Sequence, residues 1–126
     1  MRIEVLADAD AVAKKAATMI AAEARQAVAA RGRFVMAVSG GHTPWVMLRA
    51  LAEEDVPWAS VHIFQVDERV APEGHADRNL THLRASLLER APLPARQIYA
   101  MSVEMPDLQA AAAKYAAACV QSPSTI

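Results

Sequence analysis

The chain has 126 residues, of which 54% are hydrophobic and 21% charged, a balance typical of one globular domain with a buried core. Its formal net charge of −1, with Lys and Arg scattered along the sequence, argues against a nucleic-acid partner. The single Cys119 cannot form a disulfide within the chain, and the longest uncharged stretch is interrupted by a polar turn, so the composition predicts a cytoplasmic protein without a membrane span.

The first part of the sequence predicts a strand and a long helix. Residues alternate over Arg2–Leu6, which predicts a short strand. An alanine-rich helix follows; Asp8 or Asp10 can cap its start, and it runs to about Arg31 before Gly32 ends it. Apolar residues spaced by three and four predict that this helix lies on a core through Val12, Ala16, Met19, Ile20, Ala24, Ala27 and Val28.

Strands and helices alternate along the rest of the chain. The apolar run Phe34–Val38 predicts a strand covered on both faces, as in a parallel sheet. The later elements are predicted as a helix from Pro44 to about Glu54 with Trp45 packed on the strand, a strand Val61–Val66, a helix Asn79–Arg90 with Leu80, Leu83, Leu87 and Leu88 buried, a strand Gln97–Met101, and a helix from Asp107 to about Val120.

This alternation predicts right-handed crossovers and therefore an α/β fold, a Rossmann-like three-layer arrangement in which a parallel sheet carries helices on both faces. Residues 1–120 are predicted to form one α/β domain that binds a sugar phosphate, and residues 121–126 an irregular tail.

A glycine loop, Ser39-Gly40-Gly41-His42-Thr43-Pro44, joins the apolar strand to the next helix. Its glycines permit a sharp reversal and leave no Cβ between backbone N–H groups and a ligand. Thr43 is predicted as the N-cap and Pro44 as the first helical residue. Because a helix start carries free N–H groups and the positive dipole end, the loop predicts a phosphate site, with a purely structural turn as the alternative.

A second polar segment, Asp67-Glu68-Arg69, follows the next buried strand. One helix joins the two strands, so both loops reach the same carboxyl edge of the sheet, where ligands bind in open α/β sheets. We expect Arg69 to contact the phosphate and Asp67 to address substrate hydroxyls or a protonated group. The alternative is a solvated strand end with a surface ion pair. Asn79 is either a helix cap or a donor to the ligand.

Other sites have less support in the sequence. His75 with Asp77, or His82 with Glu68, lack the two-histidine helical spacing or cysteines of a metal site, so no metal is predicted. The chain contains no Gly-x-Gly-x-x-Gly run and no lysine after its glycines, which argues against nucleotide binding. No cofactor is predicted, and the oligomeric state is left open.

Taken together, the motifs resemble the N-terminal half of the 6-phosphogluconolactonase family, part of the glucosamine-6-phosphate isomerase/6-phosphogluconolactonase superfamily. The glycine loop, the segment Val61–Val70 and the segment His75–Asn79 that opens a leucine-rich helix carry this resemblance, which extends from about Met1 to Tyr115. It implies hydrolysis of 6-phospho-D-glucono-1,5-lactone in the oxidative pentose phosphate pathway, without metal or organic cofactor.

The resemblance also implies roles for individual residues. Asp67 is the candidate catalytic residue, and Asn79 matches the asparagine of the family's third motif, which we interpret as shaping the cleft. The residues implied to bind the phosphate or line the sugar site are Ser39, Gly40, Gly41, Thr43, Asp67 and Arg69.

One departure bears on activity. The family continues for roughly another hundred residues, about the size of a further domain half, and includes a Gly-x-Asp-Gly-His segment that supplies its general base. No histidine of this chain follows an Asp-Gly pair. We therefore expect a truncated lactonase with weak or absent activity alone, because anchoring a phosphate does little to lower the barrier to hydrolysis. The alternatives are a regulatory module that binds sugar phosphates and a deaminase/isomerase-like enzyme; Arg69 favours the lactonase.

Overall fold

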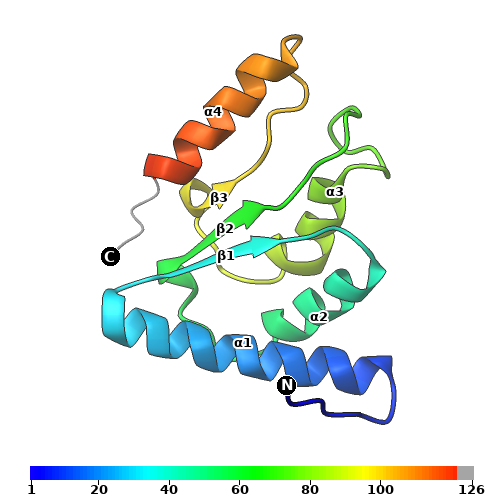
Figure 1. Cartoon of the computed structure of the whole chain (residues 1–126), viewed down its shortest axis with the longest axis vertical. Helices are drawn as coiled ribbons and strands as arrows, with labels where there is room; N and C mark the ends of the chain where they lie inside the picture. Colours follow the sequence, from blue (N-terminus) through cyan, green and yellow to red (C-terminus); the bar gives the residue numbers. More distant parts are fainter. Residues whose placement is uncertain (122–126) are drawn as a thin grey trace.

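The computed structural model describes residues 1–121. At its centre is a parallel sheet with the strand order β1-β2-β3 (Figure 1). Its elements in chain order are α1 (Ala9–Arg31), β1 (Phe34–Val38), α2 (His42–Ala52), the 3₁₀ turn η1 (Trp58–Ser60), β2 (Val61–Gln65), α3 (Asn79–Leu83) continued by the π-helical turn η2 (Arg84–Leu88), the 3₁₀ turn η3 (Ala95–Gln97), β3 (Ile98–Tyr99) and α4 (Leu108–Gln121).

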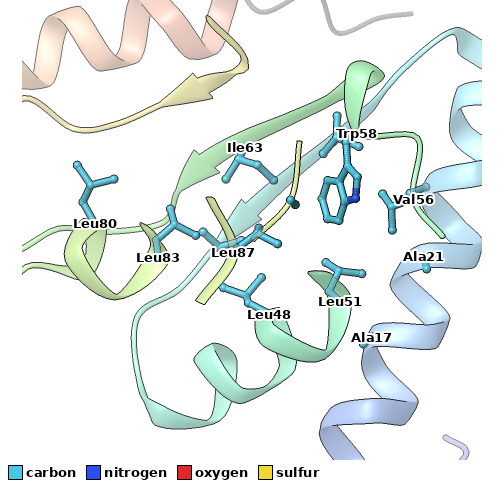
Figure 2. Packing of buried hydrophobic residues seen from close by; sticks show 14 residues of the cluster. Ala17, Ala21, Leu48, Leu51, Val56, Trp58, Ile63, Leu80, Leu83 and Leu87 are labelled. Atoms are coloured by element: carbon cyan, nitrogen blue, oxygen red, sulfur yellow. The ribbon is translucent and has the colours of Figure 1, made fainter. Parts of the chain in front are cut away.

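Helices cover the two faces of the sheet unequally. On one face, Ile63 of β2 belongs to a core that α1, α2 and α3 complete, with Leu48 and Leu87 fully buried (Figure 2). On the other face, Tyr115 of α4 meets Phe64 edge-on with ring centroids 6.2 Å apart. Figure 1 shows α4 on the opposite side of the sheet from α1 and α2. The predicted α/β class, with a parallel sheet and helices on both faces, is confirmed.

One face of strand β1 is exposed, which differs from the prediction. Its pairing places Met36 beside Ile63 and Ala37 beside Phe64, and paired residues of parallel strands point to the same face. Met36 is partly buried against the core, whereas Val35 is 43% exposed and Ala37 is exposed as well. The expected cover on both faces is therefore wrong for β1, because α4 meets the sheet at β2 and β3.

Helix α1 begins and ends where the sequence predicts. The carboxylate of Asp8 accepts a hydrogen bond of 2.8 Å from the Ala11 N–H, and Gly32 ends the helix with a φ of 82°. The predicted buried face is partly wrong, because Val12 is 47% and Met19 59% exposed. The buried residues are all alanines: Ala13, Ala17, Ala21, Ala24 and Ala27.

The alanine face is buried because α1 packs against α2, and the distance between two helix axes depends on the side chains at the contact. Small side chains let the α2 backbone approach α1 closely. The apolar spacing of three and four marks hydrophobic positions but does not distinguish alanine from larger side chains. It therefore does not predict which face of α1 packs against α2.

The beginning and end of the chain also differ from the prediction. Residues Arg2–Leu6 form no strand in the part of the chain that the structure describes; Ile3 and Val5 there are 72% and 88% exposed. They lie next to no strand of the described sheet, so alternation alone does not produce one. Gln121 belongs to α4, and residues 122–126 of the predicted tail lie outside the described residues.

The later elements have the predicted type but different lengths. The helix predicted over Asn79–Arg90 is the short α3 followed by the π-helical turn, although Leu80, Leu83 and Leu87 are buried as expected. Strand β3 has only the two residues Ile98–Tyr99. Among residues 1–121, none of the helices has both the length and the apolar character needed to span a membrane.

The close contact between α1 and α2 makes a prediction. Ala21 is 0% exposed, so Ala21→Leu adds atoms where there is no space and is expected to lower the free energy of unfolding by about 1–3 kcal/mol. Met19→Gln, on the exposed side of the same helix, is expected to change it by less than about 0.5 kcal/mol. Urea denaturation of both variants measures the difference, and equal effects would contradict the assigned face.

Candidate functional site

A cavity of about 300 Å³ lies at the carboxyl ends of β1 and β2. The loops after the two strands meet there because α2 connects adjacent parallel strands, which places both loops at one edge of the sheet. The lining residues are Gly40, Gly41, Trp45, Asp67, Arg69, Ala76, Asp77 and Asn79. The structure therefore brings together most of the residues that the sequence predicts for a ligand site.

Ser39 and Thr43 are the exceptions. Both border a different cavity, an apolar groove of about 670 Å³ between α1, β1 and α2. Thr43 is also not the N-cap: α2 begins at His42, and Gly41 occupies the cap position with a φ of 122° that favours glycine. Because glycine can take this conformation, the helix starts earlier than the threonine would allow, and the predicted cap is wrong.

The start of α2 has free donors. No side chain caps it, and its first intrahelical bond runs from the Trp45 N–H to the Gly41 carbonyl at 3.2 Å. The N–H groups of His42 and Thr43 precede this bond and have no partner within the helix. Both lie at the positive end of the helix dipole, beside the glycines that line the cavity.

Position 40 favours glycine because the Asn79 side chain occupies the space of a Cβ atom, not because of the φ angle. A Cβ at this position would lie 2.0 Å from Oδ1 of Asn79 and 2.4 Å from its Cγ, far inside van der Waals contact. The carboxamide of Asn79 also donates from Nδ2 to the carbonyl and to Oδ1 of Asp67, at 3.2 Å each. Asn79 thus packs on the first loop and hydrogen-bonds the second.

The side chain of Glu68 is completely buried, and its carboxylate holds the second loop against the start of α3. Oε1 accepts hydrogen bonds from the backbone N–H groups of Arg69 and Asn79, both at 2.7 Å. Oε2 accepts from the Leu80 N–H and from Nε2 of Gln65, both at 3.0 Å. Glu68 therefore provides the acceptor for the start of α3. Asn79 is the first residue of this helix and not its cap, and its role as a donor to the ligand stays a prediction.

Arg78 neutralises the buried carboxylate. Its side chain is 1% exposed, and its Nε lies 3.0 Å from Oε2 of Glu68. Its Nη1 donates to Oε1 of Glu104 at 2.6 Å and to the Ala71 carbonyl at 3.1 Å. Desolvation lowers the pKa of Arg78, but the hydrogen bonds and charges of Glu104 and Glu68 outweigh it, so the pKa is raised above its ordinary value.

The same network sets the ionisation of Glu68. Burial by itself raises the pKa of this carboxyl group, but hydrogen bonds from Gln65, from the Arg69 and Leu80 N–H groups and from Arg78 outweigh burial. The pKa falls from 4.5 to about 2. Glu68 is therefore a buried carboxylate, not a carboxylic acid, at neutral pH.

Sequence reasoning missed Glu68 and Arg78 as determinants of the site. One signal was available: the helix that begins at Asn79 follows an arginine, and no Ser, Thr, Asp or Asn stands at the cap position. A helix start without a local acceptor needs an acceptor from elsewhere in the chain. The acidic segment at the end of the preceding strand was the nearest source.

Trp45 forms part of the cavity wall instead of packing on the strand as predicted. Its ring stacks on His82, with centroids 3.9 Å apart and an interplanar angle of 18°. The Nε2 of His82 lies 2.7 Å from the Ala76 carbonyl, which fixes the imidazole behind the indole. The described residues contain no group of three or more His, Cys, Asp or Glu side chains that could hold a metal ion.

Arg69 is the cation of the cavity. Its side chain is exposed, and within residues 1–121 its guanidinium makes no hydrogen bond or ion pair, in contrast to that of Arg78. It lines the cavity together with the glycine loop and with the carboxylates of Asp67 and Asp77. The site therefore combines free cationic and N–H donors with carboxylate acceptors.

Comparison with known proteins identifies the family. The family described as glucosamine-6-phosphate isomerases/6-phosphogluconolactonase matches residues 7–124. The chain belongs to this family. A member from Nostoc sp. (strain PCC 7120 / SAG 25.82 / UTEX 2576), a 6-phosphogluconolactonase, is 34% identical over 113 residues, which are 90% of this chain and 47% of the relative.

Solved structures of the family have the same fold. A 6-phosphogluconolactonase from Shewanella baltica OS155 gives a TM-score of 0.82 at 25% identity, covering 94% of this chain and 50% of that one. A monomeric glucosamine-6-phosphate deaminase gives 0.79 at 14% identity, covering 91% and 48%, which shows the fold alone. The chain spans about half the length of the curated relatives it matches.

The contact between Gly40 and Asn79 makes a prediction. Gly40→Ala places a methyl group in the Asn79 carboxamide and is expected to lower the free energy of unfolding by about 1–3 kcal/mol. The same substitution made in an Asn79→Ala background is expected to cost less, because the clashing atoms are gone. Urea denaturation of the four proteins gives the coupling energy, and additive effects would contradict the contact.

The ionised Glu68 makes a second prediction. Its pKa is lower in the folded chain, so its contribution to stability is complete above about pH 4.5 and is lost as the pH falls towards 2. The shift from 4.5 to about 2 corresponds to about 3 kcal/mol. Urea denaturation at a series of pH values should show this loss, and Glu68→Gln should flatten it. A wild-type stability that stays level over this range would contradict the buried carboxylate.

Proposed function

We propose that this chain binds the phosphate of a sugar phosphate at the cavity between its glycine loop and the Asp67–Arg69 segment. We further propose that the whole protein hydrolyses 6-phospho-D-glucono-1,5-lactone to 6-phosphogluconate, a step of the oxidative pentose phosphate pathway. The observation that carries the proposal is the shared cavity, where free donors from two distant loops face one space. The lactonase relatives at 34% identity support the choice of substrate.

The phosphate is assigned to the start of α2. Backbone N–H groups at a helix start together with the positive dipole end form an anion site, and the missing side chain of Gly41 leaves the approach open. Arg69 has an unpaired guanidinium at the same cavity and supplies a charge-assisted contact. In this assignment Thr43 contributes its N–H group, and the hydroxyl of Ser39 remains a predicted ligand.

The sugar is assigned to the Asp67 side of the cavity. Asn79 holds one oxygen of the Asp67 carboxylate, which orients this group for a substrate hydroxyl or for water. In lactone hydrolysis, water adds to the C1 carbonyl, the C1–O5 bond breaks and the ring oxygen takes a proton. Within this chain Asp67 is the candidate base for the attacking water, because it lines the cavity and Asn79 orients its carboxylate.

The alternatives have less support. The similarity between this chain and the glucosamine-6-phosphate deaminase structure extends to the fold alone. The relatives that are 34% identical to this chain are 6-phosphogluconolactonases. A regulatory module would keep the same phosphate contacts. Only a measurement of turnover distinguishes it from an enzyme. We expect the reaction to take place in the cytosol without a cofactor; both expectations are from the sequence and stay predictions.

The phosphate assignment predicts the effect of Arg69→Ala. Loss of one charge-assisted contact is expected to raise the Kd for 6-phosphogluconate at least about tenfold. Trp45 lines the cavity and Trp58 is buried in the core, so tryptophan fluorescence follows binding through Trp45. Arg49→Ala, an exposed arginine in the last turn of α2, is the matched control and should leave the Kd unchanged. Equal Kd values for the two variants would contradict the anchor.

Turnover separates the enzyme from a binding module. Proton release from 6-phospho-D-glucono-1,5-lactone at constant pH, measured on the native gene product, should exceed the spontaneous rate. The 126-residue chain alone should bind 6-phosphogluconate but not gluconate, which lacks the phosphate, and should accelerate hydrolysis little. Binding by the native product without any turnover would favour the regulatory module.

A further inference from the structure

We propose that Glu68 is the positioning residue of the ligand site: its buried carboxylate sets the distance between the Arg69 segment and the Asn79 segment, and so the width of the cavity. This inference rests on the proposed function, because it concerns the same phosphate and sugar contacts. Glu68 does not line the cavity and is fully buried, so it acts on a ligand only through its neighbours.

One oxygen atom joins two segments that line the cavity. Oε1 of Glu68 accepts from the N–H of Arg69 and from the N–H of Asn79, at 2.7 Å each. Both donors belong to residues that line the cavity, on separate segments of the chain. Because both hydrogen bonds are short and end on the same atom, neither segment can move away from the other without losing one of them.

The second oxygen fixes the carboxylate to the sheet. Oε2 accepts from Nε2 of Gln65, the last residue of β2, and from the Leu80 N–H, and it lies 3.0 Å from Nε of Arg78. Gln65 is itself held, because its Oε1 accepts from the Met101 N–H at 2.8 Å after β3. The carboxylate is therefore anchored to two strands, and the cavity segments take their positions from it.

The far end of the network offers a matched control. Glu104 holds Nη1 of Arg78 at 2.6 Å, and its side chain is 44% exposed. Its partner is Arg78, which is not among the lining residues, and none of the lining residues hydrogen-bonds Glu104 in the described chain. Removing the Glu104 charge therefore weakens the ion-pair network but leaves every hydrogen bond of the Glu68 carboxylate in place.

The experiment compares Glu68→Gln with Glu104→Gln. A glutamine at position 68 turns an NH₂ group toward groups that are themselves donors, so the carboxylate's contacts cannot all be kept. Calorimetric titration with 6-phosphogluconate, at a temperature where both variants are folded, should show a Kd at least about tenfold higher for Glu68→Gln, because small displacements of binding groups are costly. Glu104→Gln should stay within about twofold of wild type, although the melting temperature of both variants falls.

A second variant keeps the test decisive if Glu68→Gln does not fold. Glu68→Asp retains the charge for Arg78, but its side chain is one methylene shorter and cannot reach both segments. It should raise the Kd in the same way and speed hydrogen exchange at the Arg69 and Asn79 amides. Wild-type affinity in the folded Glu68 variants would overturn the positioning role.

Failure of the proposed function gives a different result. If the wild-type chain binds neither 6-phosphogluconate nor inorganic phosphate, the ligand assignment is wrong. Amide exchange then decides the positioning role alone. Slow exchange at Arg69 and Asn79 in Glu68→Asp, equal to that of wild type, would overturn it, and selective fast exchange at these two amides would support it.

Discussion

The hydrogen bonds of the buried Glu68 carboxylate are the constraint on which the rest of the site depends. A carboxylate without partners is very costly to bury, so every acceptor site must be filled. Here the partners are the backbone N–H groups of Arg69 and of the first two residues of α3, the side chain of Gln65 and, as an ion pair, the guanidinium of Arg78. Arg78 is buried as well and requires Glu104 and the Ala71 carbonyl in turn. The charge balance of the interior thus fixes the shape of the cavity that lies beside it.

The two glycines of the loop are required for two different steric reasons. Gly41 takes a backbone conformation that other residues rarely adopt, and this lets α2 begin beside the cavity with free N–H groups. Gly40 instead leaves space for the Asn79 carboxamide, which in turn holds Asp67. A conformational and a contact requirement therefore act on adjacent residues. Together they place the glycines that precede α2 and an oriented carboxylate at a single cavity.

Charge divides the cavity into two parts with different chemistry. Arg69 and the start of α2 provide a positive environment with donors that other protein groups do not use. Asp67 and Asp77 provide acceptors on the same cavity wall. A sugar phosphate has a matching division, with an anion at one end and hydroxyl groups along the ring. Trp45, which stacks on His82, adds an aromatic surface to the cavity wall.

The sequence by itself determined the features that depend on near neighbours: an aspartate cap at the start of α1, the stop at Gly32 and the strand–helix alternation that brings two loops to one edge. Backbone sterics and side-chain spacing decide these within a few residues. The tertiary structure alone decided that α1 buries its alanines, that Ser39 faces a different groove from Gly40, and that Glu68 pairs with Arg78. Each of these depends on the packing distance between elements or on a partner in another segment, and the spacing of residue types measures neither.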